Sequence, residues 1–227
     1  MIGGPLLRPA GPGQSYWMCH FCGRPPGTAV SSQLDPWIAA LTPQQRLENI
    51  LWTGTLLGSV PFGATHNMVC FSESSPEHLY WLLRERGFSG WGLLFTRQWV
   101  YDLFGGPVWY ARNDQYNALT CDQRDWAVRL EAGAADWLHE REWRIRVLPQ
   151  HSGLLVRPED IEAILVEDPN WAPWRQYQVP TGYLIGMDGL PSEDGVAEET
   201  RLEWLLPPLW RPERRLIWDR PTQRFLN

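Results

Sequence analysis

The stretch of the sequence whose side chains are best suited to catalysis is WLHEREWRIR, residues 137–146, which holds one histidine, two glutamates and three arginines. The alternation of polar and apolar residues in EWRIRVL predicts a strand. If the strand begins near Glu140, then Glu140 and Glu142 share one face, and Arg141 and Trp143 lie on the other. Two carboxylates on one face can divide labour, one stabilising a cation and the other orienting a nucleophile. The alternative is a surface ladder of ion pairs between these glutamates and arginines.

A second candidate is the C-x-x-C pair of Cys19 and Cys22, which encloses His20. A structural zinc site takes four ligands, and the chain has no second such pair, although Cys70 and Cys121 could complete a site in space. A redox pair would open a helix in a thioredoxin-like context, which the following Gly-Arg-Pro does not supply. We therefore expect no metal, and two buried thiols on a strand around a histidine.

Common catalytic motifs are absent from the sequence. It contains no Walker loop, no G-x-S-x-G, no H-E-x-x-H and no dinucleotide fingerprint. Spacing alone supports no serine, histidine and aspartate triad. The glutamates and His20 remain the strongest candidates for chemistry.

The overall composition is that of an ordinary soluble protein. The 227 residues are 44% hydrophobic and 20% charged, with a net charge of −6, which argues against a nucleic-acid footprint along the whole chain. No run of about 18 apolar residues could span a bilayer, and the first residues lack the pattern of a signal peptide. We expect a cytoplasmic protein without membrane contact. Its 15 tryptophans are either large core and interface residues or anchors for a flat aromatic ligand.

Several short strands interrupted by helices predict an α+β domain. Thr42, Pro43, Gln45 and Gly54 carry the start and stop signals of one helix. The remaining patterns predict strands at 15–21, 67–73, 90–96, 105–112 and 142–148, helices at 76–86 and 116–139, and a helical turn leading into a strand at 158–168.

The chain divides by composition into three parts. Residues 1–15 are rich in glycine and proline and are expected to form a flexible arm. Residues 16–170 hold the predicted helices and strands of one domain. Residues 171–227 form a proline- and tryptophan-rich extension, with an acidic segment, that packs either on the domain or on a partner.

The order of several motifs adds to this interpretation. The succession HF, RLENILWTGTLLG, VCFSE, GWGLLFTRQWVYDLFGGPVWYAR and HEREWRIR resembles the AbiGi-like abortive-infection proteins, a bacterial phage-resistance family, over residues 19–168. More distantly, the layout is similar to that of the DarT-type ADP-ribosyltransferases. This second resemblance implies a split NAD-binding fold of two small packed β-sheets with flanking helices.

The resemblance also implies roles for particular residues. His20, or alternatively Arg24, would stand in the first motif and contact a ribose of NAD. Ser72, with Phe71 beside it, would support the nicotinamide pocket. Glu142 would be the catalytic glutamate, and Glu140 makes the pair similar to the E-x-E of arginine-directed members.

The implied function is a toxin or effector of phage defence that transfers ADP-ribose from NAD to a nucleic acid or a protein. In that reaction a glutamate bound to the ribose 2′-hydroxyl stabilises the oxocarbenium ion. One alternative is a non-catalytic antitoxin or sensor that binds a cognate toxin, another defence subunit or a phage component. Another is an NAD glycohydrolase, which passes the same cation to water.

Overall fold

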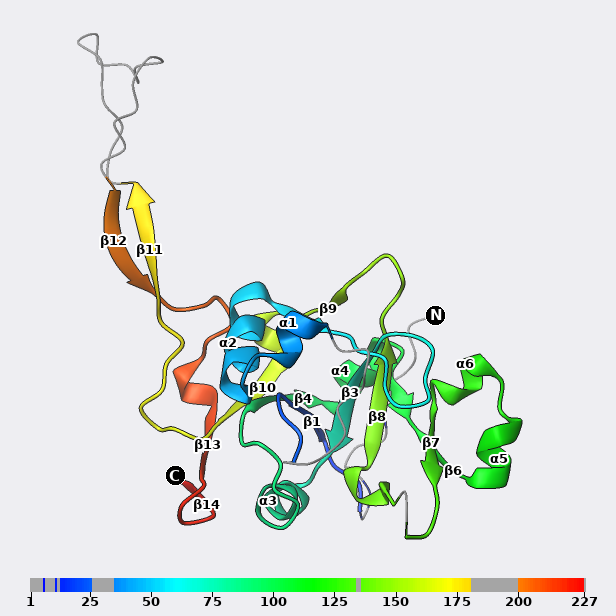
Figure 1. Ribbon diagram of the computed structural model, residues 1–227. Coiled ribbons are helices and arrows are strands. Elements are labelled where there is room, and N and C mark those ends of the chain that lie inside the picture. The colour runs from blue at the N-terminus through cyan, green and yellow to red at the C-terminus, as the bar shows by residue number, and fades with distance from the viewer. Residues whose placement is uncertain are drawn as a thin grey trace, which may run out of the picture.

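A computed structural model describes residues 6, 11, 13–25, 35–133, 136–180 and 200–226 of the protein (Figure 1). The helices are α1 Pro36–Ala39, α2 Pro43–Thr53, α3 Pro76–Arg84, α4 Arg97–Asp102, α5 Asn113–Ala118 and α6 Cys121–Arg124, with 3₁₀ turns η1 Leu138–Glu140, η2 Pro158–Asp160 and η3 Pro212–Arg214. The strands are β1 Trp17–Phe21, β2 Thr55–Leu57, β3 Met68–Glu73, β4 Gly92–Thr96, β5 Gly106–Pro107, β6 Trp109–Arg112, β7 Ala127–Leu130, β8 Glu142–Arg146, β9 Gly153–Leu155, β10 Ile161–Val166, β11 Arg175–Pro180, β12 Thr200–Leu205, β13 Arg215–Asp219 and β14 Arg224–Leu226.

Eight of the described strands form one main sheet in the order β14-β13-β10-β4-β1-β3-β8-β5. Neighbouring strands are antiparallel except β10 and β13, which are parallel. The pairs β2 with β9, β6 with β7, and β11 with β12 form small sheets. Helices combined with a largely antiparallel sheet make an α+β fold, which confirms the predicted class.

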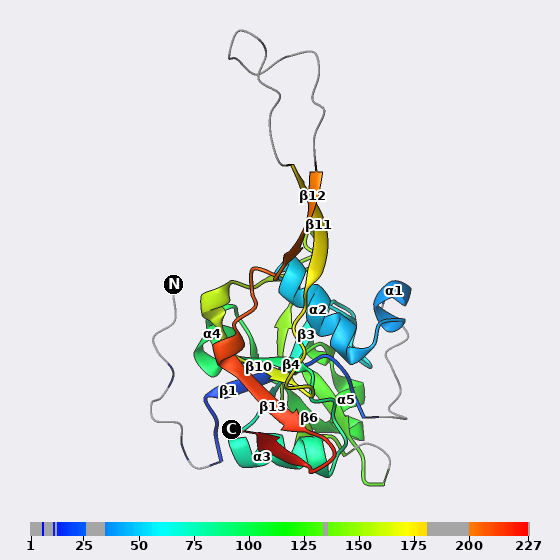
Figure 2. The ribbon, with the colours of Figure 1, turned by 90° about the vertical axis from the view of Figure 1, so that its left-hand side faces the viewer.

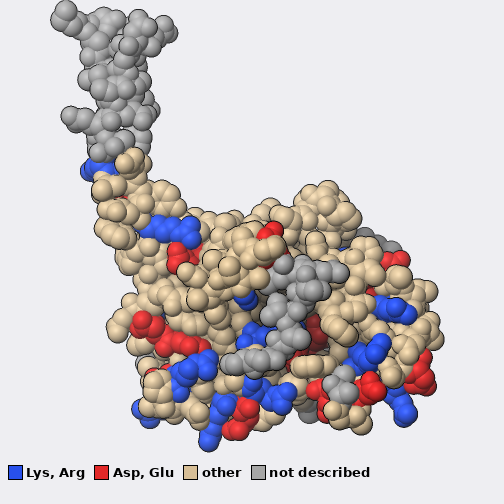
Figure 3. Space-filling view, in the orientation of Figure 1, with Lys and Arg blue, Asp and Glu red and all other residues tan. Residues whose placement is uncertain are grey.

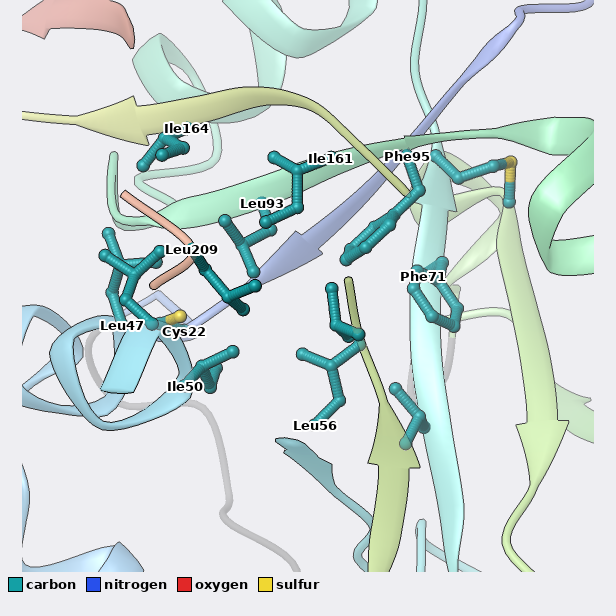
Figure 4. Close-up of a cluster of buried hydrophobic side chains, with 14 of the residues drawn as sticks. Cys22, Leu47, Ile50, Leu56, Phe71, Leu93, Phe95, Ile161, Ile164 and Leu209 are labelled. Carbon is teal, nitrogen blue, oxygen red and sulfur yellow. The ribbon is translucent and has the colours of Figure 1, made fainter. Parts of the chain in front are cut away.

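The main sheet has little hydrogen bonding between its central strands β1 and β3. These strands pair at only two positions, Met18 with Glu73 and Cys19 with Ser72. In contrast, β1 pairs with β4 at five positions, and β3 with β8 at five. The sheet therefore consists of a β14-to-β1 part and a β3-β8-β5 part that share a short junction. In Figure 4, β3 and β8 run across the direction of β4 and β10.

Helices cover both faces of the main sheet (Figures 1 and 2). The core on the first face takes Leu47, Ile50 and Leu51 from α2, and the core on the second takes Leu79, Leu82 and Leu83 from α3. Strand β4 serves both cores, because Leu93 and Phe95 point to the α2 side while Leu94 points to the α3 side. This two-sided burial explains why its sequence is continuously apolar.

The predicted signals of α2 act as expected. The Thr42 side chain accepts a hydrogen bond from the Gln45 backbone, and the Gln45 side chain accepts one from the Thr42 backbone. Gly54 ends the helix in the left-handed conformation with φ 64°. The predicted helix at 76–86 is confirmed as α3, which ends two residues earlier, at Arg84.

The prediction of one helix over residues 116–139 is wrong. The segment contains the end of α5, then α6, then β7, which pairs in parallel with β6, and finally η1. Thr120 and Gln123 form a capping box that starts a new helix inside the predicted one, and Gly133 adopts φ 76°. The apolar residues Trp126, Leu130 and Leu138 follow the spacing of a helix face. The pairing of β7 with β6 nevertheless determines the conformation of this segment.

The predicted strand at 105–112 is interrupted. Its first part, β5, pairs with β8 in the main sheet, whereas its second part, β6, pairs with β7 in a separate small sheet. Val108 lies between them, and its backbone N–H donates to the Glu142 carbonyl at 3.0 Å. This segment therefore connects the main sheet to the small sheet beside Glu142.

Residues after 170 form strands of the main sheet as well as a hairpin that projects from the body. Strand β13 pairs with β10 and carries Trp218, which is 1% exposed in the α3-side core. The β11–β12 hairpin projects away from the body in both ribbon views (Figures 1 and 2). The acidic segment at 191–199 lies outside the described residues, as does most of the arm predicted at 1–15.

No helix in the described part of the chain is long and apolar enough to cross a membrane.

Candidate functional site

Glu140 and Glu142 occupy the entrance to β8, but they do not share a strand face as predicted. The strand begins at Glu142, and Glu140 is the last residue of η1. Arg141 between them has φ 47°, a left-handed conformation that costs a residue with a side chain roughly 1 kcal/mol or more. The turn therefore brings two buried carboxylates together, with 8% of Glu140 and 6% of Glu142 exposed.

Glu142 is held by a buried ion pair and not by a surface ladder. Arg144 lies two residues along β8 on the same face and is 2% exposed. Its Nε donates to Oε1 of Glu142 at 2.9 Å, and its Nη2 donates to Oε2 at 3.2 Å. Burial lowers the pKa of Arg144, but the Glu142 carboxylate, together with Cys70 and Tyr116, raises it overall. Arg144 Nη1 also donates to the Asp125 carbonyl at 2.7 Å, which fixes the pair against the start of β7.

Two further groups touch Glu142. The backbone N–H of Glu142 donates to the Tyr110 hydroxyl oxygen at 2.8 Å. The Cys70 thiol lies next to the Glu142 carboxylate, and burial together with the glutamate charge raises the pKa of that thiol. Burial is also the main cause of the raised pKa of Tyr110. Both groups therefore remain protonated, and each can serve as a neutral hydrogen-bond donor.

Glu140 is less firmly paired than Glu142. Arg24 Nη1 lies 3.5 Å from Oε1 of Glu140, and the Arg24 side chain is 46% exposed. Burial raises the pKa of Glu140, the Arg24 charge lowers it, and the nearby Glu142 charge raises it again, with a net increase. A buried carboxylate with a raised pKa and a half-exposed partner is a candidate proton acceptor.

His20 lies where β1 and β3 separate. Its Nδ1 is 3.0 Å from the carbonyl oxygen of Cys70, and burial lowers the pKa of its imidazole despite that contact. The backbone of Cys70 thus contacts His20, while its side chain contacts Glu142. The two side chains nevertheless lie on opposite faces of the sheet, because His20 packs beside Phe71 and Glu142 lies on the face of Ser72 and Arg144.

Ser72 positions the turn that carries Glu140. Its hydroxyl donates to the Glu140 carbonyl at 2.6 Å and lies 3.1 Å from the Ser74 hydroxyl. His78 continues this network, with Nδ1 3.2 Å from the Ser74 hydroxyl and Nε2 2.8 Å from the His139 carbonyl. Burial is the main cause of the lowered pKa of His78. These bonds to successive carbonyls stabilise the strained turn before β8.

Phe71 lies on the other face of β3. It is 2% exposed in the α2-side core, and its ring centroid is 5.8 Å from that of Phe95 and 6.2 Å from that of Trp99 (Figure 4). The centroid of the His20 ring is also 5.8 Å away. Phe71 therefore packs behind the strand that carries Ser72, within reach of His20 but away from the glutamates.

Glu73 is a buried carboxylate that sequence reasoning missed. Its Oε1 accepts a hydrogen bond from the Ser15 backbone at 2.8 Å, and its Oε2 accepts one from the Trp143 indole at 3.1 Å. Arg97 and Arg141 lie 3.5 and 3.8 Å from Oε1. Glu73 is therefore a structural anchor. No local pattern distinguishes it, because its partners come from distant parts of the chain.

Aromatic rings and an arginine border the Glu140 turn. The Trp81 ring stacks on His78 with centroids 6.1 Å apart, and the His139 ring meets Trp81 edge-on at 5.8 Å. The Arg86 guanidinium lies 6.0 Å from the centre of the Trp81 ring. Arg86 also acts on Glu140, because its positive charge lowers the pKa of that carboxyl. This border combines stacking surfaces with positive charge.

One group in the described residues has side chains of the kind that bind metals. His66, Asp122 and Asp125 offer ligand atoms within 4.8 Å of one another. However, His66 Nδ1 lies 2.7 Å from Asp125, and Arg146 contacts both aspartates. Arg146 already balances the two carboxylates, so the group is complete as an ion-pair network. The cysteines form no such group, and Cys121 is exposed.

Two recesses of the described surface lie away from the glutamates. One is lined by Trp174 and Trp204 at the β11–β12 hairpin, and the other by residues of β6, α5 and the end of β7. Acidic and basic side chains alternate over the body in Figure 3. Arg24 is the charged partner of Glu140 in the observed conformation, so a ligand that binds this carboxylate would have to displace it.

Comparison of the chain with protein-family models, with curated proteins and with solved structures gave no match.

Proposed function

We propose that the protein is a mono-ADP-ribosyltransferase of a phage-defence system that transfers ADP-ribose from NAD to a nucleic acid or a protein. The observation that carries this proposal is the pair of buried carboxylates, Glu140 and Glu142, at the start of β8, with Arg24 and Cys70 beside them. Cys70 and Glu142 come from the neighbouring strands β3 and β8, Glu140 comes from η1 directly before β8, and His20 lies on β1, on the other side of β3. The two-pair junction between β1 and β3 supports the finer proposal of a split NAD-binding fold.

The glutamate pair has the capacity that the reaction needs. A carboxylate can accept about four hydrogen bonds. Arg144 supplies two donors to Glu142, and the adjacent Cys70 thiol can supply a third. One position remains for the 2′-hydroxyl of the ribose that bears nicotinamide. The bond from ribose C1′ to nicotinamide breaks, its electron pair leaves with nicotinamide, and the Glu142 carboxylate stabilises the resulting cation.

Glu140 serves the second half of the reaction. The acceptor atom attacks C1′ and loses a proton, and Glu140 accepts that proton in its ionised form. Its raised pKa makes it a stronger base than an exposed glutamate. Arg24 must first leave Glu140, and its half-exposed side chain can do so without disturbing the core. The same arginine, with Arg86 and the Trp81 ring, can bind the diphosphate and a base of NAD.

The test is incubation of the wild-type protein with NAD labelled in its adenine, in separate reactions with DNA, RNA and a protein lysate. We expect label on one acceptor class together with stoichiometric release of nicotinamide. Glu140→Gln should reduce transfer by roughly 10²-fold or more, as expected for loss of a general base. Glu162→Gln, which replaces an exposed glutamate of β10, is the matched control and should retain full activity.

Wild-type protein that neither labels an acceptor nor releases nicotinamide would refute the transferase proposal. Nicotinamide release without labelling would instead identify an NAD glycohydrolase. Equal activity of Glu140→Gln and wild type would remove the proposed role of Glu140.

A further inference from the structure

The β11–β12 hairpin has two faces of different character. Its strands pair at six positions, from Arg175 with Leu205 to Pro180 with Thr200. Residues paired across an antiparallel ribbon share a face, and successive residues alternate between faces. The pairing therefore places Arg175, Tyr177 and Glu203 on one face. It places Gln176, Trp204, Gln178 and Leu202 on the other.

The charged face is turned toward the body. Arg175 Nε lies 2.9 Å from Glu48 of α2, and its guanidinium lies 5.1 Å from the centre of the Trp52 ring. The Tyr177 ring meets the same Trp52 at a centroid distance of 5.3 Å. These contacts fix the base of the hairpin on α2 and leave its other face outward.

The outward face is apolar and exposed. Leu202 is 60% exposed and Trp204 is 61% exposed. Trp174, which directly precedes β11, is 50% exposed and lines a shallow apolar recess together with Trp204. The face includes two glutamines and no charged residue among its described members. We name Trp174, Gln176, Gln178, Leu202 and Trp204 the tryptophan face.

We infer that the tryptophan face is the interface between two copies of this chain. A two-stranded hairpin on its own is only marginally stable in water. An extended apolar face on such a hairpin is therefore expected to be buried against another surface. A tryptophan presents roughly 150–250 Å², so the exposed parts of the two rings, Leu202 and the glutamines approach about 500 Å² per copy. Two copies would bury about 1,000 Å², the lower end of specific interfaces, which fits a weak and reversible dimer.

Charge favours a second copy in one particular arrangement. The tryptophan face is uncharged, so two copies can meet there without repulsion, although each chain carries a net charge of −6. The connection from Pro180 to Thr200 leaves from the free end of the hairpin, and its sequence contains five acidic residues and no basic one. Antiparallel packing about a two-fold axis keeps these acidic connections apart, whereas parallel packing would bring them together. Figures 1 to 3 show that the described strands of the hairpin stand clear of the body, which leaves their outward face open to a second copy.

Sedimentation equilibrium over a roughly hundredfold range of concentration tests this inference. We expect a monomer–dimer equilibrium whose dissociation constant changes little with salt, because no charged group takes part. Trp204→Ala removes a ring from both halves of the interface and should weaken the dimer by about a hundredfold, roughly tenfold for each ring. Leu202→Glu should abolish the dimer by placing two carboxylates in it.

Trp37→Ala is the matched control. Trp37 is 49% exposed but lies on α1, and its replacement should leave the dissociation constant unchanged. Far-ultraviolet circular dichroism checks that each variant is folded. A wild-type protein that stays monomeric throughout would overturn the inference, as would a dimer that Trp204→Ala and Leu202→Glu leave intact. This experiment does not depend on NAD turnover, so its outcome is separate from that of the proposed function.

Discussion

Replacement of Glu142 by glutamine will affect both stability and chemistry, and the structure allows the two effects to be separated. The Glu142–Arg144 pair is buried and bidentate, with 7% and 3% of the two side chains exposed. Loss of one partner leaves the other charge buried without compensation, at a cost of about 3–5 kcal/mol. For a chain of this length, about 3 kcal/mol lowers the melting temperature by roughly 6–12 °C. Glu142→Gln should therefore remain folded at 25 °C, since domains are stable by roughly 5–15 kcal/mol.

The double variant Glu142→Gln/Arg144→Met removes both charges. Because replacing a whole buried pair is often nearly neutral, we expect the double variant to regain most of the lost stability. Urea unfolding of the wild type, Glu142→Gln, Arg144→Met and the double variant gives the coupling energy. NAD turnover should remain lost in the double variant, because the group that stabilises the cation is absent. Recovery of turnover together with stability would show that Glu142 is structural and would refute its catalytic role. A coupling energy below about 0.5 kcal/mol would refute the buried-pair reasoning.

Two further predictions concern the residues around the site. Phe71→Ala should lower the free energy of unfolding by about 3–5 kcal/mol, and Phe71→Leu by less than about 1.5 kcal/mol. If Phe71→Leu loses NAD turnover at near-normal stability, the ring contacts the cofactor as well as the core. Stability should also fall as the pH drops through about 6.5, because the pKa values of His20 and His78 are lowered in the fold, so the unfolded chain binds protons first. Urea unfolding between pH 8 and pH 5 measures this loss, which should be smaller in His78→Gln, and an unchanged slope in that variant would contradict the buried, neutral state of His78.

Local signals in the sequence were sufficient where the structure depends on neighbouring residues. The capping box of Thr42 and Gln45 and the stop at Gly54 gave α2 correctly, because caps form between residues three or four positions apart. Alternation identified β8, and continuous apolar runs identified β3 and β4. The same reasoning failed at residues 116–139, where pairing of β7 with β6 decided the conformation.

The candidate site shows the same division. The sequence indicated His20, Ser72, Glu140 and Glu142 as candidate functional residues, and it predicted that strands would carry most of them. It could not determine that η1 would place Glu140 beside Glu142, or that Ser72 would bind the Glu140 carbonyl. The sequence pattern suggested that Arg144 lies at the surface, but the structure buries Arg144 against Glu142.

What the sequence determined by itself was a set of local conformations and the chemical types available at each position, because these depend on side-chain shape and on near neighbours. What only the tertiary structure decided was which charges are buried and with which partners. Glu73, Glu140 and Glu142 are the same residue type within one short region of space. Glu73 is a structural anchor, Glu140 has a raised pKa, and Glu142 is paired with Arg144. Their differences arise from burial and from contacts across strands, which no local pattern encodes.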